Sequence, residues 1–169
     1  YGADHAEVAT TLTNLGNAYG QLGDAGRARD LLERALAIDE RKYGADHAHV
    51  AITLTNLGNA YGDLGNAARK RDLLEQALEI DERTCGPDHA EIAITLTNLG
   101  NAYGDLGDAG RQRDLLERAL AIDERTYGAD HAKVAITLAN LGNAYGDLGD
   151  QVRKRDLLER ALAIKERTY

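Results

Sequence analysis

The chain has 169 residues with a formal net charge of −8, one cysteine, one proline and no Trp, Met or Phe. The acidic balance argues against a nucleic-acid partner, because phosphate binding relies on clustered Lys and Arg, and the lone Cys85 excludes a disulfide framework or a thiolate metal cage. No apolar run approaches the roughly 20 residues that span a bilayer and no basic-then-apolar leader is present, so we expect a cytoplasmic protein without membrane contact.

The chain consists of four copies of one 42-residue sequence, which align without a gap. The copies cover residues 1–42, 43–84, 85–126 and 127–168, and Tyr169 would begin a fifth copy. A fixed period of this size is typical of a repeat array and not of a globular enzyme fold, so we treat residues 1–169 as a single array. Because the chain lacks methionine, we expect it to be part of a longer or processed protein.

The first predicted element of each copy is an amphipathic helix. In the first copy, apolar side chains recur at steps of four and three residues, which places them on one stripe of a helix. This stripe consists of Val8, Leu12, Leu15, Tyr19 and Leu22. Asp4 and Glu7 precede the stripe with the spacing of a capping box, and Asp88 with Glu91 repeats that spacing in the third copy. We therefore expect the first helix to begin near His5.

The second predicted helix runs from about Ala25 to Lys42 or Tyr43, with Gly23 ending the helix before it and Asp24 as its cap. Its inward-facing residues are Leu31, Leu32, Ala35, Leu36 and Ile38. Neither helix can bury its apolar stripe alone, so stacking of neighbouring repeats must complete the core.

Two glycines, Gly16 and Gly20, lie inside the first predicted helix. Each costs about 1 kcal/mol relative to alanine at such a position. We expect a close contact between helices to compensate for this cost.

These helices resemble tetratricopeptide repeats. Leu12, Leu15, Gly16 and Tyr19 match the first-helix pattern of that family, and Ala28, Leu32 and Ala35 match the second-helix pattern. The 42-residue period and the GPDHAEIA stretch at 86–93 are similar to the long variants in kinesin light chains and related bacterial arrays. The resemblance implies an all-α fold, a right-handed α-solenoid of four helix–turn–helix repeats with eight antiparallel helices. It also implies a non-enzymatic scaffold that binds a protein or peptide.

One position departs from the family pattern. The small residue Ala28 is replaced by Lys70, Gln112 and Lys154 in the other three copies. Because this position lies in the middle of the apolar stripe, we expect that these three long polar side chains are not all buried.

The resemblance implies a concave peptide-binding groove along the polar face of the first helices. The candidate groove residues are Thr13, Asn17 and Gln21 in the first copy, Ile52, Thr55, Asn59 and Asp63 in the second, Ile94, Thr97, Asn101 and Asp105 in the third, and Ile136, Asn143 and Asp147 in the fourth. An amide side chain offers both a donor and an acceptor, which suits a peptide backbone. The alternative is that the asparagines tie neighbouring helices together.

Two other sets on this face also have two interpretations. Ile52, Ile94 and Ile136 either form an apolar strip for a partner or pack against the preceding repeat, and the first copy has Thr10 instead. The aspartates at 63, 105 and 147 either favour a basic partner segment or belong to a solvated face.

Four Asp-His pairs recur, at 4–5, 46–47, 88–89 and 130–131. Histidines one repeat apart are too distant to share a zinc ion, and no nucleophile recurs beside them, so we expect no catalytic, cofactor or metal site. We expect instead that the aspartates near the ends of the second helices contact the histidines of the next copy. These are Asp39, Asp81 and Asp123 with His47, His89 and His131, and the last copy has Lys165 in place of the aspartate.

Two alternatives to groove binding remain open. The first helix of the first copy and the second helix of the last copy lack a polar capping helix, which favours head-to-tail self-association. The near-identity of the copies is also typical of an engineered or excised array with no specific ligand.

Overall fold

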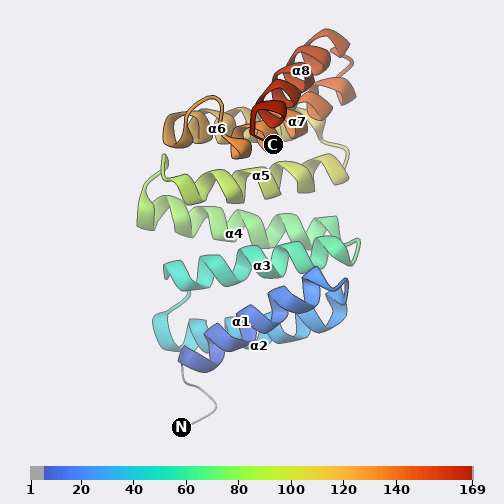
Figure 1. Ribbon diagram of the computed structural model, residues 1–169. Coiled ribbons are helices and arrows are strands. Elements are labelled where there is room, and N and C mark those ends of the chain that lie inside the picture. The colour runs from blue at the N-terminus through green and yellow to red at the C-terminus, as the bar shows by residue number, and fades with distance from the viewer. Residues whose placement is uncertain (1–5, 169) are drawn as a thin grey trace. The chain divides into compact units, whose positions relative to one another are not determined.

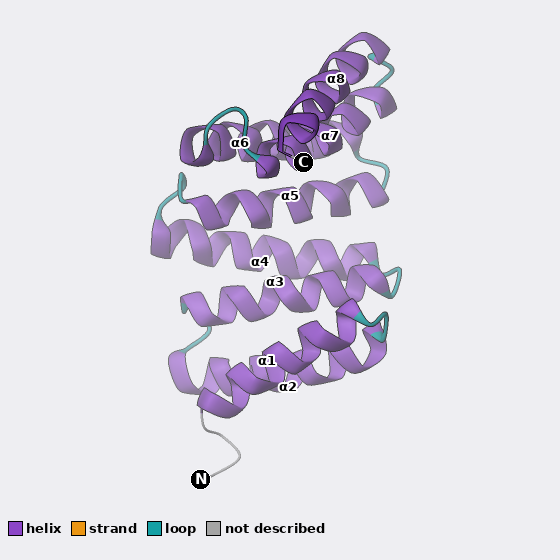
Figure 2. Cartoon of the chain, in the orientation of Figure 1, coloured by secondary structure: helices purple, strands orange, loops and turns teal. Residues whose placement is uncertain are grey.

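The computed structural model describes residues 6–168, and every regular element in that range is an α-helix (Figures 1 and 2). The eight helices are α1 (Ala6–Gln21), α2 (Ala25–Tyr43), α3 (Ala48–Asp63), α4 (Ala67–Cys85), α5 (Ala90–Asp105), α6 (Ala109–Tyr127), α7 (Ala132–Asp147) and α8 (Gln151–Thr168). The all-α class predicted from the sequence is confirmed. The predictions on Asp4, His5 and Tyr169 lie outside the described residues.

The chain forms two compact units that divide after Pro87, each with two helical hairpins. In the first unit, α1 packs along α2, α3 packs along α4, and α2 contacts α3. In the second unit, α5 pairs with α6, α7 pairs with α8, and α6 contacts α7. The contacts between hairpins bury the apolar stripes, as Leu32 of α2 and Leu54 of α3 show in the core of the first unit.

Each hairpin is tight because glycine allows its two helices to approach. A β-carbon at Gly16 would lie 2.8 Å from Leu32 Cγ, and one at Gly58 would lie 3.1 Å from Leu74 Cγ. The expected helix contact at the Gly16 position is therefore confirmed. The turn between the helices places Gly23 at a φ of 80°, a conformation that glycine adopts without steric cost.

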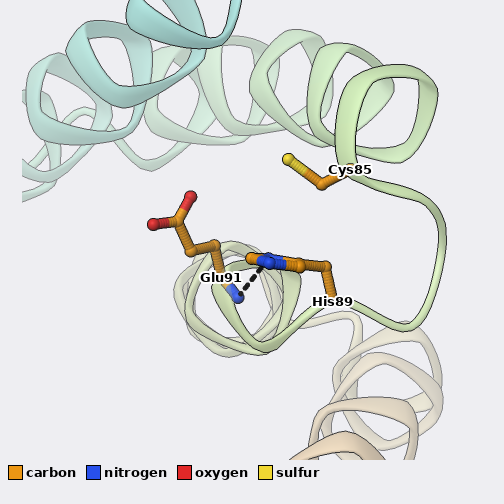
Figure 3. Close-up of side chains that lie close together, drawn as sticks. All are labelled: Cys85, His89 and Glu91. Atoms are coloured by element: carbon orange, nitrogen blue, oxygen red, sulfur yellow. Dashed lines mark hydrogen bonds between the residues drawn. The ribbon is translucent and has the colours of Figure 1, made fainter.

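The predicted capping box at Asp88 is wrong, because the side chain that caps α5 is His89. His89 Nδ1 accepts a hydrogen bond from the backbone N–H of Glu91 at 3.4 Å (Figure 3). His47 and His131 cap α3 and α7 in the same way. Asp88 lies one residue too early to reach the free N–H groups of the first turn, and it pairs with Arg125 Nη2 at 3.1 Å instead.

Two leucines of the predicted first-helix stripe are exposed. Leu15 is 45% exposed, whereas its counterparts Leu57 and Leu141 are only 2% and 3% exposed. The counterparts lie in α3 and α7, which pack against α2 and α6, and no described helix precedes α1. Leu22 is 80% exposed because it lies beyond the last residue of α1, in the turn to α2.

Candidate functional site

The first unit contains a hollow of about 340 Å³ on the face formed by α1 and α3. Four candidate groove residues meet there, with Asn17 and Gln21 coming from α1 and Asn59 and Asp63 from α3. The remaining lining residues are Gly16, Gly20, Ala28, Leu32, Asn56 and Ala60. The other candidates on these helices do not line the hollow: Thr13 and Thr55 are half-buried, and Ile52 is exposed. Its lining combines amide side chains with glycine, alanine and leucine, and it carries one charge, on Asp63.

The second unit has a smaller hollow of about 230 Å³ between α5 and α7. It brings together three candidate residues, Ile94, Thr97 and Ile136, and its lining also includes Asn98, Asp123, Lys133 and Thr137. Asn101, Asp105, Asn143 and Asp147 do not line it. Among them Asn101 is half-buried, and the other three are exposed.

The isoleucines of this face remain accessible. Ile52, Ile94 and Ile136 are 46%, 49% and 55% exposed. About half of each side chain is therefore accessible, and Ile94 and Ile136 share one hollow.

The asparagines of the predicted groove carry side-chain amides that lack a protein partner in the described part of the chain. The side-chain amides of Asn17, Asn59, Asn101 and Asn143 form no hydrogen bond with any residue between 6 and 168. Each amide retains its donors and its acceptor. A bound chain could use both.

The expected contact between aspartate and histidine is wrong for Asp39 and Asp123. Asp39 Oδ2 accepts a hydrogen bond from Thr53 Oγ1 at 2.8 Å, and Asp123 Oδ2 accepts one from Thr137 Oγ1 at 2.8 Å. All four residues are buried. The histidines lie just before the next helix, and their side chains cap that helix instead.

The sequence carries a signal for this threonine that we missed. The same position holds Thr11, Thr53, Thr95 and Thr137 in the four copies. A polar residue repeated among the apolar residues of a helix stripe indicates a buried partner. Thr11 donates instead to Glu7 O of its own helix at 2.7 Å.

A second set of contacts between hairpins, also missed from the sequence, joins tyrosine to glutamate. Tyr61 Oη donates to Glu33 Oε1 at 2.7 Å, and Tyr145 Oη donates to Glu117 Oε1 in the second unit. Glu33 and Glu117, through these hydrogen bonds, raise the pKa of Tyr61 and Tyr145 above 10.0, and burial adds to the effect. Tyr145 also lines a mainly apolar hollow of about 410 Å³ between α6, α7 and α8.

A family profile for tetratricopeptide repeats matches residues 7–69, 50–111 and 113–167, and a second tetratricopeptide profile matches residues 92–133. The chain belongs to the tetratricopeptide repeat family. Repeats of this family generally mediate protein–protein interactions and typically act as non-enzymatic scaffolds. A comparison with curated protein sequences finds no match.

Solved structures of tetratricopeptide-like arrays resemble the chain over nearly its whole length. BtubC (BKLC) from P. vanneervenii is 27% identical with a TM-score of 0.85, and the match covers 95% of this chain and 64% of BtubC. The chain thus spans less than two thirds of that protein. The nearly identical TPR-like repeats of a Podosopora anserina protein assigned as a kinesin light chain are 26% identical with a TM-score of 0.79, covering 99% of this chain and 80% of that one.

The apo form of RapI shares the fold at 19% identity, with a TM-score of 0.85 over 97% of this chain and 58% of RapI. The predicted resemblance to kinesin light chain arrays is confirmed. Among residues 6–168, none of the helices has the length and apolar character that crossing a membrane requires.

Proposed function

We propose that this chain is a scaffold that binds an extended peptide or a helix along the face of α1 and α3, and along the face of α5 and α7. The observation that carries the proposal is the set of unpaired amides on this face, of which Asn17 and Asn59 line one hollow. Both amides are half-buried, so water reaches their donors and acceptors in the free chain. A peptide backbone supplies a donor and an acceptor at each residue, and it would satisfy them.

The exposed isoleucines support the proposal that a partner binds on this face. Ile94 and Ile136 supply apolar contact area, while the amides supply hydrogen bonds. This combination of apolar anchors and a few polar groups is typical of protein-binding surfaces.

The test is an unbiased peptide-display screen against the 169-residue chain, followed by binding measurements on the selected peptides. We expect the double substitution Asn17→Ala and Asn59→Ala to weaken binding about tenfold, because each lost hydrogen bond contributes about 0.5–1.5 kcal/mol. The control is Gln76→Ala, which removes an exposed amide from α4, a second helix that does not line the hollow. Failure to enrich any motif, or equal binding by both variants, would count against the groove.

Head-to-tail self-association is a second candidate. Leu15 on α1 is 45% exposed, and Val152 and Leu162 on α8 are 61% and 55% exposed. These side chains would be covered if α8 of one copy stacked on α1 of another, as α2 stacks on α3 within the chain. Light scattering over a concentration series measures the molar mass and so tests for self-association. A constant monomer mass would exclude it.

A further inference from the structure

One position differs between the four repeats in a way that changes the groove. In three copies a long side chain of the second helix crosses a glycine of the first helix. Lys70 Cδ lies 2.7 Å from where a β-carbon of Gly62 would be, Lys154 Cδ lies 2.6 Å from that of Gly146, and Gln112 Cδ lies 2.7 Å from that of Gly104. These side chains occupy the space that the glycines leave open.

The first copy leaves the same space empty. Ala28 replaces the long residue, and its Cβ is the nearest atom to the β-carbon position of Gly20, at 3.9 Å. Gly20 and Ala28 are two of the walls of the 340 Å³ hollow. The hollow thus exists where the chain does not fill the site with its own lysine or glutamine.

The rim of the hollow suits a cation. Asp63 carries the only charge among its lining residues and forms no ion pair with any residue between 6 and 168. The side-chain oxygens of Asn17, Gln21 and Asn59 add acceptors. No Lys or Arg lines the hollow, so an incoming ammonium group meets no like charge there, and the amides can turn their oxygens toward it.

We propose that this hollow is a socket for a lysine side chain of a bound basic peptide. The methylene chain would cross Gly20 as that of Lys70 crosses Gly62, and the ammonium group would meet Asp63 and the amide oxygens at the rim. A lysine suits this role because its apolar stem can lie on the surface while its charge stays at the edge. This inference rests on the proposed groove function and names the chemistry of its ligand.

The test uses an end-capped octapeptide of four Ala-Lys units, titrated into the 169-residue protein and followed by backbone amide NMR. The comparison peptide carries norleucine in place of each lysine, which keeps most of the stem and removes the charge. We expect the lysine peptide to shift the amide signals of Gly16, Gly20 and Asn59, and the norleucine peptide to leave them in place. Asp63→Asn should weaken binding about two- to fivefold, as expected for a partly exposed ion pair.

The decisive variant is Ala28→Lys, which fills the socket as Lys70 and Lys154 fill theirs. We expect it to lower the affinity for the lysine peptide by at least about tenfold, because the site is already occupied. Its control is Ala37→Lys, which adds the same charge to an exposed position of the same helix. If Ala28→Lys unfolds on circular dichroism, Ala28→Gln serves in its place, since Gln112 is accommodated at the equivalent position.

A further variant tests whether a second lysine site can be created. Gln112→Ala empties the equivalent space over Gly104, and we expect the binding stoichiometry to rise from one peptide to two. Equal affinity of the Ala28→Lys and Ala37→Lys variants for the lysine peptide would overturn the proposal of a lysine socket. If peptides from the display screen depend on Asn17 and Asn59 but bind the Ala28→Lys variant as well as the parent chain, the groove stands and only the socket is wrong.

Discussion

At the scale of single residues, two glycines of α1 have different surroundings although only one helical turn separates them. A β-carbon on Gly16 would collide with Leu32 Cγ at 2.8 Å and with the carbonyl oxygen of Ala28 at 3.3 Å. A β-carbon on Gly20 would make only an ordinary contact with Ala28 at 3.9 Å. The glycine at 16 is required by close packing, whereas the glycine at 20 leaves room.

We expect the two alanine substitutions to have opposite effects. Gly16→Ala should lower the free energy of unfolding by about 1–3 kcal/mol, because it overpacks the contact with Leu32. Gly20→Ala should raise it by up to about 1 kcal/mol through helix propensity. Urea unfolding followed by circular dichroism measures both values, and a stabilised Gly16→Ala variant would contradict the packing seen here.

At the scale of elements, a buried hydrogen bond between α2 and α3 sets how one hairpin stacks on the next. Thr53 and Asp39 are only 2% and 6% exposed, and their side chains are 2.8 Å apart. A buried carboxylate that loses a donor pays for desolvation without compensation. A buried hydrogen bond therefore holds α2 and α3 together in addition to their apolar packing.

Substitution of this threonine tests the link. We expect Thr53→Val to destabilise the chain by about 1–3 kcal/mol, because the valine keeps the shape but leaves Asp39 short of a donor. Thr11→Val changes the same position of the first repeat, where the hydroxyl is exposed and bonds within its own helix. That control should change stability by less than about 0.5 kcal/mol, and equal losses in the two variants would argue against the contact with Asp39.

The bond between Tyr61 and Glu33 predicts a pH dependence for the same pair of hairpins. The glutamate raises the pKa of Tyr61 above 10.0, and burial adds to the effect. The stability from this bond is therefore fully present below about pH 10 and is lost as pH rises through the raised folded value. The difference in urea midpoint between the parent chain and Tyr61→Phe should shrink from pH 9 to pH 11. A difference that stays constant over that range would exclude the bond.

At the scale of the whole molecule, the two units repeat one plan but differ in the hollows on their surfaces. The first unit has a hollow lined by amides and by Asp63, which forms no ion pair with any residue between 6 and 168, and the second has hollows lined by Ile94 and Ile136 and by Leu120 and Tyr145. One substitution that contributes is Ala28 against Gln112, because the glutamine fills the space over Gly104 whereas the space over Gly20 is open. A nearly identical repeat can thus vary its surface hollows without changing its helices.

Much of this organisation could be predicted from the pattern of residues. Helix positions follow from the spacing of Leu12, Leu54 and their equivalents, because a helical period depends on local geometry alone. The polar face with Asn17 and Asn59 follows from the same geometry. The histidine caps were not predicted. In each copy an aspartate directly precedes the histidine, and the sequence pattern alone makes the aspartate equally suitable as the N-cap.

The sequence by itself determined the repeat, the eight helices and the face that carries the candidate groove, because each depends on residues close together in the chain. Only the tertiary structure decided that Thr53 and not His47 meets Asp39, and that Lys70 and Gln112 fill a space that Ala28 leaves open. Both depend on distances between side chains of different helices. The physical reason is that periodicity sets the direction of a side chain, while the depth of packing sets what it reaches.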